Sequence, residues 1–159
     1  MNSFEIYRNG TDIFFSTRTS AGGASVKVGY TTGEWAKFTF IADRSNNMLS
    51  AYKNGAFDNQ STGSGRIPSS LSTSTLRVGT SVCVSKDGTP QYNGAIDELY
   101  IYQKNLTTQE ITSADTQNDD EQFSPVYSNK FDLATQEELR PDPATNTKDQ
   151  AIKTKLRAR

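Results

Sequence analysis

The sequence predicts an all-β protein, an antiparallel β-sandwich followed by an extended C-terminal tail. Three observations lead to this class. Short runs of alternating apolar and polar residues recur from residue 1 to about 113. Gly, Asn, Asp and Ser residues, which favour turns, separate these runs. The apolar spacing of a helix is nearly absent from the same region. Several short strands at such intervals indicate two packed sheets or a barrel.

The predicted strands can be justified in chain order. The first alternates Phe4 and Ile6 with polar residues and stops at Asn9-Gly10, a favoured two-residue hairpin turn. A later run, 48–53, stops in the same way at Asn54-Gly55. The remaining runs are 12–16, 24–30, 34–43, 75–80 and 95–103. Between them, 56–74 and 81–94 are predicted to be long loops, which serve either as binding segments or as plain connectors.

The run at 34–43 sorts its residues by face. Alternation places Phe38 and Phe40 opposite Trp35, Lys37 and Thr39, because neighbouring side chains of a strand point to opposite sides. One face of this strand is therefore more polar than the other.

The last run contains two adjacent acids, Asp97 and Glu98. Strict alternation places them on opposite faces, and it does the same for Ile96 and Leu99. The two carboxylates then cannot flank one glycosidic bond, so the sequence argues against a glycosidase.

From about residue 114 the composition changes, and we predict a domain over 1–113 and a tail over 114–159. The tail has few apolar residues and a Pro-containing breaker at 140–145, which indicates an extended or disordered segment. Short helices are possible at 133–139 and 148–156. Apolar residues in its first part are spaced so that they could anchor the tail to a surface.

Composition excludes several classes of function. The 17 basic and 18 acidic residues nearly balance, so a nucleic acid is not an expected partner. No apolar run approaches the ~20 residues needed to span a bilayer, and the N-terminus does not resemble a signal peptide. Histidine is absent and Cys83 is the single cysteine, which excludes His-dependent triads, His-ligated metals and an internal disulfide. We expect no enzyme activity.

Three blocks in this order resemble the laminin-G-like, or concanavalin A-like lectin/glucanase, superfamily. "GEWAKFTFIAD" (33–43) is similar to the family's Gly-x-Trp, strand and closing Asp, and "MLSAYKNGAF" (48–57) is similar to its strand ending in Tyr-x-Asn-Gly. "LRVGT" (76–80), followed by "YNGAIDELYIYQKNLTTQEI" (92–111), looks like its Gly-x-Ile-Asp-Glu strand and its closing Leu-x-x-x-Glu-Ile turn. The resemblance covers about residues 25–113 and implies a jelly-roll sandwich.

The resemblance also implies roles for particular residues. Trp35 would be a core residue, because it opens a buried strand in the family pattern. Leu106 and Ile111 would pack at the edge of the core, and Glu110 would cap backbone donors. The family's opening strands are largely missing from this chain. Either the sandwich is minimal, or the tail supplies strands, or another chain does, because exposed sheet edges are avoided in natural proteins.

Asp97 is the candidate metal ligand. The resemblance implies a structural Ca²⁺ at this position, and hard oxygen ligands suit that ion. The alternative is that backbone N–H groups satisfy the Asp97 carboxylate while Glu98 is solvated.

Four loop residues are the candidate ligand site: Tyr92, Asp87, Asn93 and Phe57. Their aromatic rings would stack on a sugar and their polar groups would hydrogen-bond its hydroxyls; the alternative is that they are ordinary solvated loop residues.

Two functions stay open. The first is a non-catalytic recognition module that binds a glycan or a protein, as the resemblance implies, at an extracellular or virion surface. The second is a structural subunit of a larger assembly such as a fibre, virion or filament, with the tail as a strap between subunits. In either case we expect a homo-oligomer or an assembly, because the edges of an incomplete sandwich invite strand addition.

Overall fold

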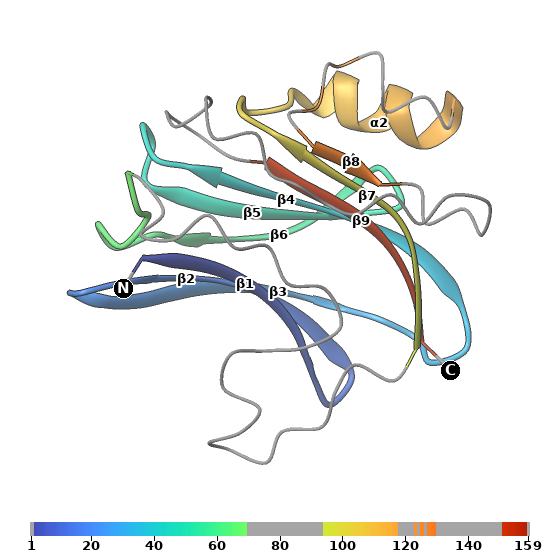
Figure 1. The fold of residues 1–159 in the computed structure, drawn as a ribbon, viewed down its shortest axis with the longest axis horizontal. Helices are drawn as coiled ribbons and strands as arrows, with labels where there is room; N and C mark the ends of the chain where they lie inside the picture. The colour runs from blue at the N-terminus through green and yellow to red at the C-terminus, as the bar shows by residue number, and fades with distance from the viewer. Residues whose placement is uncertain are drawn as a thin grey trace.

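Two antiparallel sheets lie face to face in this computed structural model, which describes residues 2–69, 94–117, 123, 125, 127–129 and 151–158 (Figure 1). The smaller sheet has the order β1-β2-β3, formed by Ser3–Asn9, Asp12–Thr19 and Gly22–Gly29. The larger has the order β6-β5-β4-β9-β7-β8. Its strands are Ala56–Thr62 (β6), Met48–Lys53 (β5), Trp35–Asp43 (β4), Ala151–Ala158 (β9), Gly94–Tyr102 (β7) and Tyr127–Asn129 (β8). The predicted antiparallel sandwich is confirmed.

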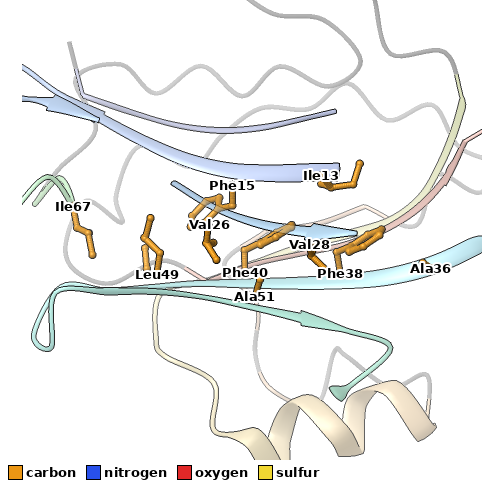
Figure 2. Packing of buried hydrophobic residues seen from close by; sticks show 11 residues of the cluster. Ile13, Phe15, Val26, Val28, Ala36, Phe38, Phe40, Leu49, Ala51 and Ile67 are labelled. Carbon is orange, nitrogen blue, oxygen red and sulfur yellow. The ribbon is translucent and has the colours of Figure 1, made fainter. Parts of the chain in front are cut away.

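The main core lies between the two sheets and is built by the alternation seen in the sequence. Phe15 of β2 and Phe40 of β4 face each other across the interface with ring centroids 5.4 Å apart, and both are fully buried. Figure 2 shows the side chains around them pointing into the same layer. The buried cluster consists of Ile13, Phe15, Val26, Val28, Ala36, Phe38, Phe40, Ala42, Leu49, Ala51 and Ile67.

A second, smaller cluster covers part of the outer face of the larger sheet. Helix α2 (Thr108–Gln117) lies over this face beside β7 and β8 (Figure 1). The cluster consists of Ile41, Tyr52, Tyr100, Tyr102, Leu106 and Ile111. Leu106 and Ile111 are buried as expected, but they pack on the outer face of the sheet and not between the sheets.

Helix α2 begins at a reciprocal cap. The Thr107 backbone N–H donates to Glu110 Oε2 at 2.7 Å, and the Glu110 N–H donates to Thr107 Oγ1 at 3.2 Å. This is a capping box, in which two donors at a helix start are satisfied together. The expected capping role of Glu110 is confirmed, although the predicted turn continues as a helix to Gln117.

The two predicted hairpin turns differ in outcome. Asn54 and Gly55 have φ angles of 50° and 77° and join the paired residues Lys53 and Ala56, as a two-residue turn with positive φ at both central positions requires. In the first hairpin Asn9 is itself paired with Asp12, so the central residues are Gly10 and Thr11. Gly10, with φ 62°, takes the first central position, where such turns favour glycine.

Strand β6 lies where a loop was predicted over 56–74. Its residues Ala56–Thr62 are nearly all exposed and include Asp58 and Asn59, types that are depleted in strands. The strand is held at the sheet edge by pairing with β5 and by side chains that reach the smaller sheet. Asn59 Nδ2 donates to the Lys27 carbonyl at 3.1 Å, and Ser61 Oγ donates to the Ser25 carbonyl at 2.6 Å. Pairing with β5 across the Asn54-Gly55 turn, together with these bonds to the smaller sheet, therefore makes this segment a strand despite its polar composition.

The tail contributes two strands to the larger sheet. The helix predicted over 148–156 is wrong, because residues 151–158 form β9 between β4 and β7. Ile152, Thr154 and Leu156 alternate with basic residues, and this period of two suits a strand in the middle of a sheet. Of the three ways to complete the sandwich, the structure has the one in which the tail supplies strands. The other predicted helix, 133–139, lies outside the described residues.

Candidate binding site

Trp35 lies at the start of β4 with 40% of its surface exposed, so the expectation that it is a core residue is wrong. Alternation along β4 explains the difference. Phe38 and Phe40 are completely buried on the inner face, which leaves Trp35 on the outer face. Helix α2 packs over the opposite end of this face, around Ile41. Trp35 is the single tryptophan of the chain.

The strand register shows which residues share this end of the sheet. Trp35 pairs with Arg157 of β9, which pairs on its other side with Ala95 of β7. In the next row on the outer face, Lys37 pairs with Lys155, which pairs with Asp97. We call the three larger described side chains of these rows, Trp35, Lys37 and Asp97, the Trp35 rim.

Two of the predicted ligand residues come directly before this rim in the chain. Tyr92 and Asn93 precede Gly94, the first residue of β7, whose register partner is Ala158. The chain therefore enters the sheet next to the row of Trp35. Tyr92 and Asn93 themselves, together with Asp87, lie outside the described residues.

The fourth predicted ligand residue, Phe57, lies elsewhere on the larger sheet. It is 53% exposed on the edge strand β6 and forms an edge-to-face contact with Tyr52, ring centroids 5.5 Å apart. Its row runs through Tyr52 to Thr39. Thr39 lies four residues along β4 from Trp35, and Phe57 lies two strands away from β4. At ~3.3 Å per residue and ~4.8 Å per strand, Phe57 and Trp35 are therefore about 16 Å apart. Phe57 therefore belongs to a different part of the surface from the Trp35 rim.

Asp97 and Glu98 lie at a β-bulge. Asp97 pairs with Lys155 and Leu99 pairs with Thr154, so Glu98 is an extra residue with no register partner, and its φ is 56°. A bulge interrupts the strict alternation of a strand. Ile96 and Leu99 consequently share one face, contrary to the prediction that they face opposite sides.

Glu98 is half-buried, whereas one alternative expected it to be solvated. Its Oε2 atom is buried and has no hydrogen-bond partner among the residues that the structure describes. An unpartnered buried carboxylate oxygen and a positive φ at a residue with a Cβ both cost stability. The sequence pattern gave no sign of this, because a bulge is a long-range pairing feature.

The described residues do not form a calcium cage around Asp97. Calcium takes six to eight oxygen ligands, usually including several carboxylates. No group of three or more acidic, histidine or cysteine side chains is found in the part of the chain that the structure describes. The register neighbours in the row of Asp97 are lysines 155 and 37, whose charge disfavours a cation. Calcium at Asp97 therefore stays a prediction.

A second acid, Asp43, joins two loops at the far end of β4. Its carboxylate accepts the Asn46 N–H at 2.9 Å and the Asn46 side-chain amide at 2.7 Å. Burial raises the pKa of Asp43, but hydrogen bonds from Asn46, Ser45 and Asn105 together outweigh it, so the pKa lies below its ordinary value. The carboxylate is already surrounded by donors, so its role is to hold the β4–β5 turn and the loop before α2.

The Trp35 rim was missed as a site by sequence reasoning, although a signal for it was present. Alternation already grouped Trp35 with Lys37 and Thr39, on the more polar face of the strand. The family pattern, which places a Trp at the start of a buried strand, outweighed that signal. No helix among the described residues is long and apolar enough to cross a membrane.

Comparison with known protein families gives a match over most of the chain. A family model described as concanavalin A-like lectin/glucanases superfamily, of the laminin G type, matches residues 1–112. The match covers the smaller sheet, the strands β4 to β7 and the start of α2. No curated protein and no solved structure matches the chain.

Proposed function

Because this chain belongs to the concanavalin A-like lectin/glucanases superfamily, we propose that it is a non-catalytic recognition module that binds a glycan at the Trp35 rim. Domains of this superfamily of the laminin G type are in general recognition modules. The finer assignment, to a glycan and to this rim, is supported by the residues that the fold gathers there.

One observation carries the proposal: the 40% exposure of Trp35 on the outer face of the larger sheet. An indole ring is a large, rigid apolar surface with a polar N–H, so it can stack on the C–H face of a sugar ring. Asp97 lies two strands away from Trp35, in the next row of the outer face. Its carboxylate can accept hydrogen bonds from sugar hydroxyls. Tyr92 and Asn93, which directly precede Gly94 in the chain, would add a second aromatic ring and an amide.

Two features of the chain support a binding module rather than a hydrolase, the first against histidine-dependent hydrolases and the second against glycosidases. Histidine is absent, which excludes a histidine general base. Asp97 and Glu98 are adjacent at a bulge, whereas glycosidases hold two carboxylates on either side of the scissile bond, at ~5–5.5 or ~6.5–9.5 Å.

A glycan array with matched variants tests the proposal. We expect the wild-type chain to bind a restricted set of glycans, Trp35→Ala to lose that binding and Phe57→Ala to keep it. Both substitutions remove an exposed aromatic ring, so Phe57→Ala controls for a general change of the surface. Equal loss in both variants, or no loss in Trp35→Ala, would contradict the assignment of the rim. If the chain binds proteins but no glycan, the proposed ligand class is wrong and the ligand is a protein.

The second candidate function is a structural subunit of a larger assembly. The strap between subunits would then be β9, which lies at the centre of the larger sheet and would have to pair with β4 and β7 of another copy. A chain that binds no glycan and forms a defined oligomer would favour this second function.

A further inference from the structure

The strand at the centre of the larger sheet comes from a distant part of the chain. β9 is paired with residues 35–41 of β4 on one side and with residues 94–102 of β7 on the other, antiparallel to both. In the strand order, β9 alone joins β4 to β7. If it is withdrawn, the sheet divides into a β6-β5-β4 part and a β7-β8 part, with an unpaired edge on each. We call the space between these two edges the β9 slot.

The sequence of β9 suits both faces of the sheet at this slot, the inner face toward the core and the outer face. Ile152 and Leu156 pair with Phe40 and Ala36, which belong to the buried core. The basic residues Lys153, Lys155 and Arg157 fall in the rows of the outer face, where Lys155 is the register partner of Asp97. The alternation of apolar and basic residues therefore fixes the register, because a slip by one residue would place the basic positions in the core.

The connection to β9 does not restrict the strand to the slot of its own chain. Residues 130–150, 21 in number, separate β8 from β9. A chain of that length spans up to ~70 Å when extended. A domain of 159 residues has a radius of gyration of roughly 15 Å. The linker can therefore reach the slot of a neighbouring molecule, where the strand would form the same backbone bonds.

We propose that residues 151–158 are an exchangeable strand and that two copies of this chain associate by each filling the β9 slot of the other. Exchange of an identical element creates a dimer without new contacts, so it has a low free-energy cost. In such a dimer Arg157 of one copy is the register partner of Trp35 of the other, so the strand beside each Trp35 rim comes from the neighbouring copy. Two rims in one particle would also raise the avidity for a repeating ligand. The proposal does not depend on the identity of that ligand.

A charge exchange between Asp97 and Lys155 tests whether the strand is donated in trans. Two full-length chains, Asp97→Lys with one affinity tag and Lys155→Asp with another, are refolded together from denaturant at equal concentration. The first chain's slot then matches the second chain's strand, whereas each variant alone pairs like charges. At equal concentrations the binomial share of the mixed dimer is one half of all dimers. We expect nearly all dimers of the two variants to be mixed, while two differently tagged wild-type chains give the binomial share.

A backbone variant provides the second arm of the test. Thr154→Pro removes an N–H from the middle of β9 and is expected to abolish the dimer, whereas Thr154→Val keeps the N–H and the dimer. Three results would overturn the proposal. The first is a wild-type chain that is monomeric in light scattering after refolding at high micromolar concentration. The second is a mixed dimer at no more than its binomial share, and the third is a dimer that persists in Thr154→Pro.

Discussion

Replacement of Phe40 by alanine tests the packing between the sheets. Phe40 is fully buried and stacks against Phe15 of the opposite sheet, with ring centroids 5.4 Å apart, and against Phe38 of its own strand at 6.3 Å. Buried Phe→Ala substitutions cost ~3–5 kcal/mol of unfolding free energy. Phe40 joins the two sheets and takes part in two ring contacts, so we expect about 4 kcal/mol. That is a large part of the ~5–15 kcal/mol that holds a typical domain.

Phe57→Ala is the matched control for this experiment. It removes the same ring from a side chain that is 53% exposed, so we expect a cost of at most ~1 kcal/mol. Urea unfolding followed by circular dichroism measures both, and the midpoint should fall in Phe40→Ala with little change in the slope. A loss in Phe40→Ala no larger than that in Phe57→Ala would show that the two sheets do not pack as the structure has them.

Three further predictions concern single side chains. The pKa of Glu110 is lowered by hydrogen bonds from Lys104 and Thr107, so its contribution to stability is present above the ordinary pKa of 4.5 and is lost as the pH falls through the lower folded value. Glu110→Gln should therefore reduce the acid dependence of the unfolding free energy, and an unchanged pH profile would refute this. If calcium binds Asp97, calcium should raise the melting temperature and Asp97→Asn should remove that rise; the absence of any rise in the wild-type chain would end the calcium hypothesis. Hydrolysis of β-glucans should be undetectable by reducing-sugar assay, and turnover that disappears in Glu98→Gln would overturn the non-catalytic assignment.

Much of the fold followed from local pattern in the sequence. Alternation of apolar residues identified the buried face of β4, and Asn54-Gly55 identified the turn between β5 and β6, because both are set by neighbouring residues. The strands β6 and β9 were missed. β6 is polar, and it is held by its pairing with β5 and by bonds to the smaller sheet, while β9 is a strand because the slot between β4 and β7 receives it.

In the candidate site, too, some features followed from the local sequence and others depend on strand pairing. Asp97 was identified from its motif, but the bulge at Glu98 that sets the faces of β7 is a property of the pairing with β9. Trp35 was assigned to the core from the family pattern, whereas its own strand placed it on the more polar face. Three of the four predicted ligand residues lie outside the described part of the chain, so their role stays a prediction.

Fluorescence of Trp35 during titration with an array-selected glycan is the most direct test of the proposed function. The chain has one tryptophan, so the emission of the wild-type protein reports on the rim without any substitution. Stacking of a sugar on a half-exposed indole removes water from it, so we predict a shift of the emission to shorter wavelength that saturates with ligand. A glycan whose binding is measured by calorimetry, but which leaves the emission of Trp35 unchanged at saturation, would contradict binding at this rim.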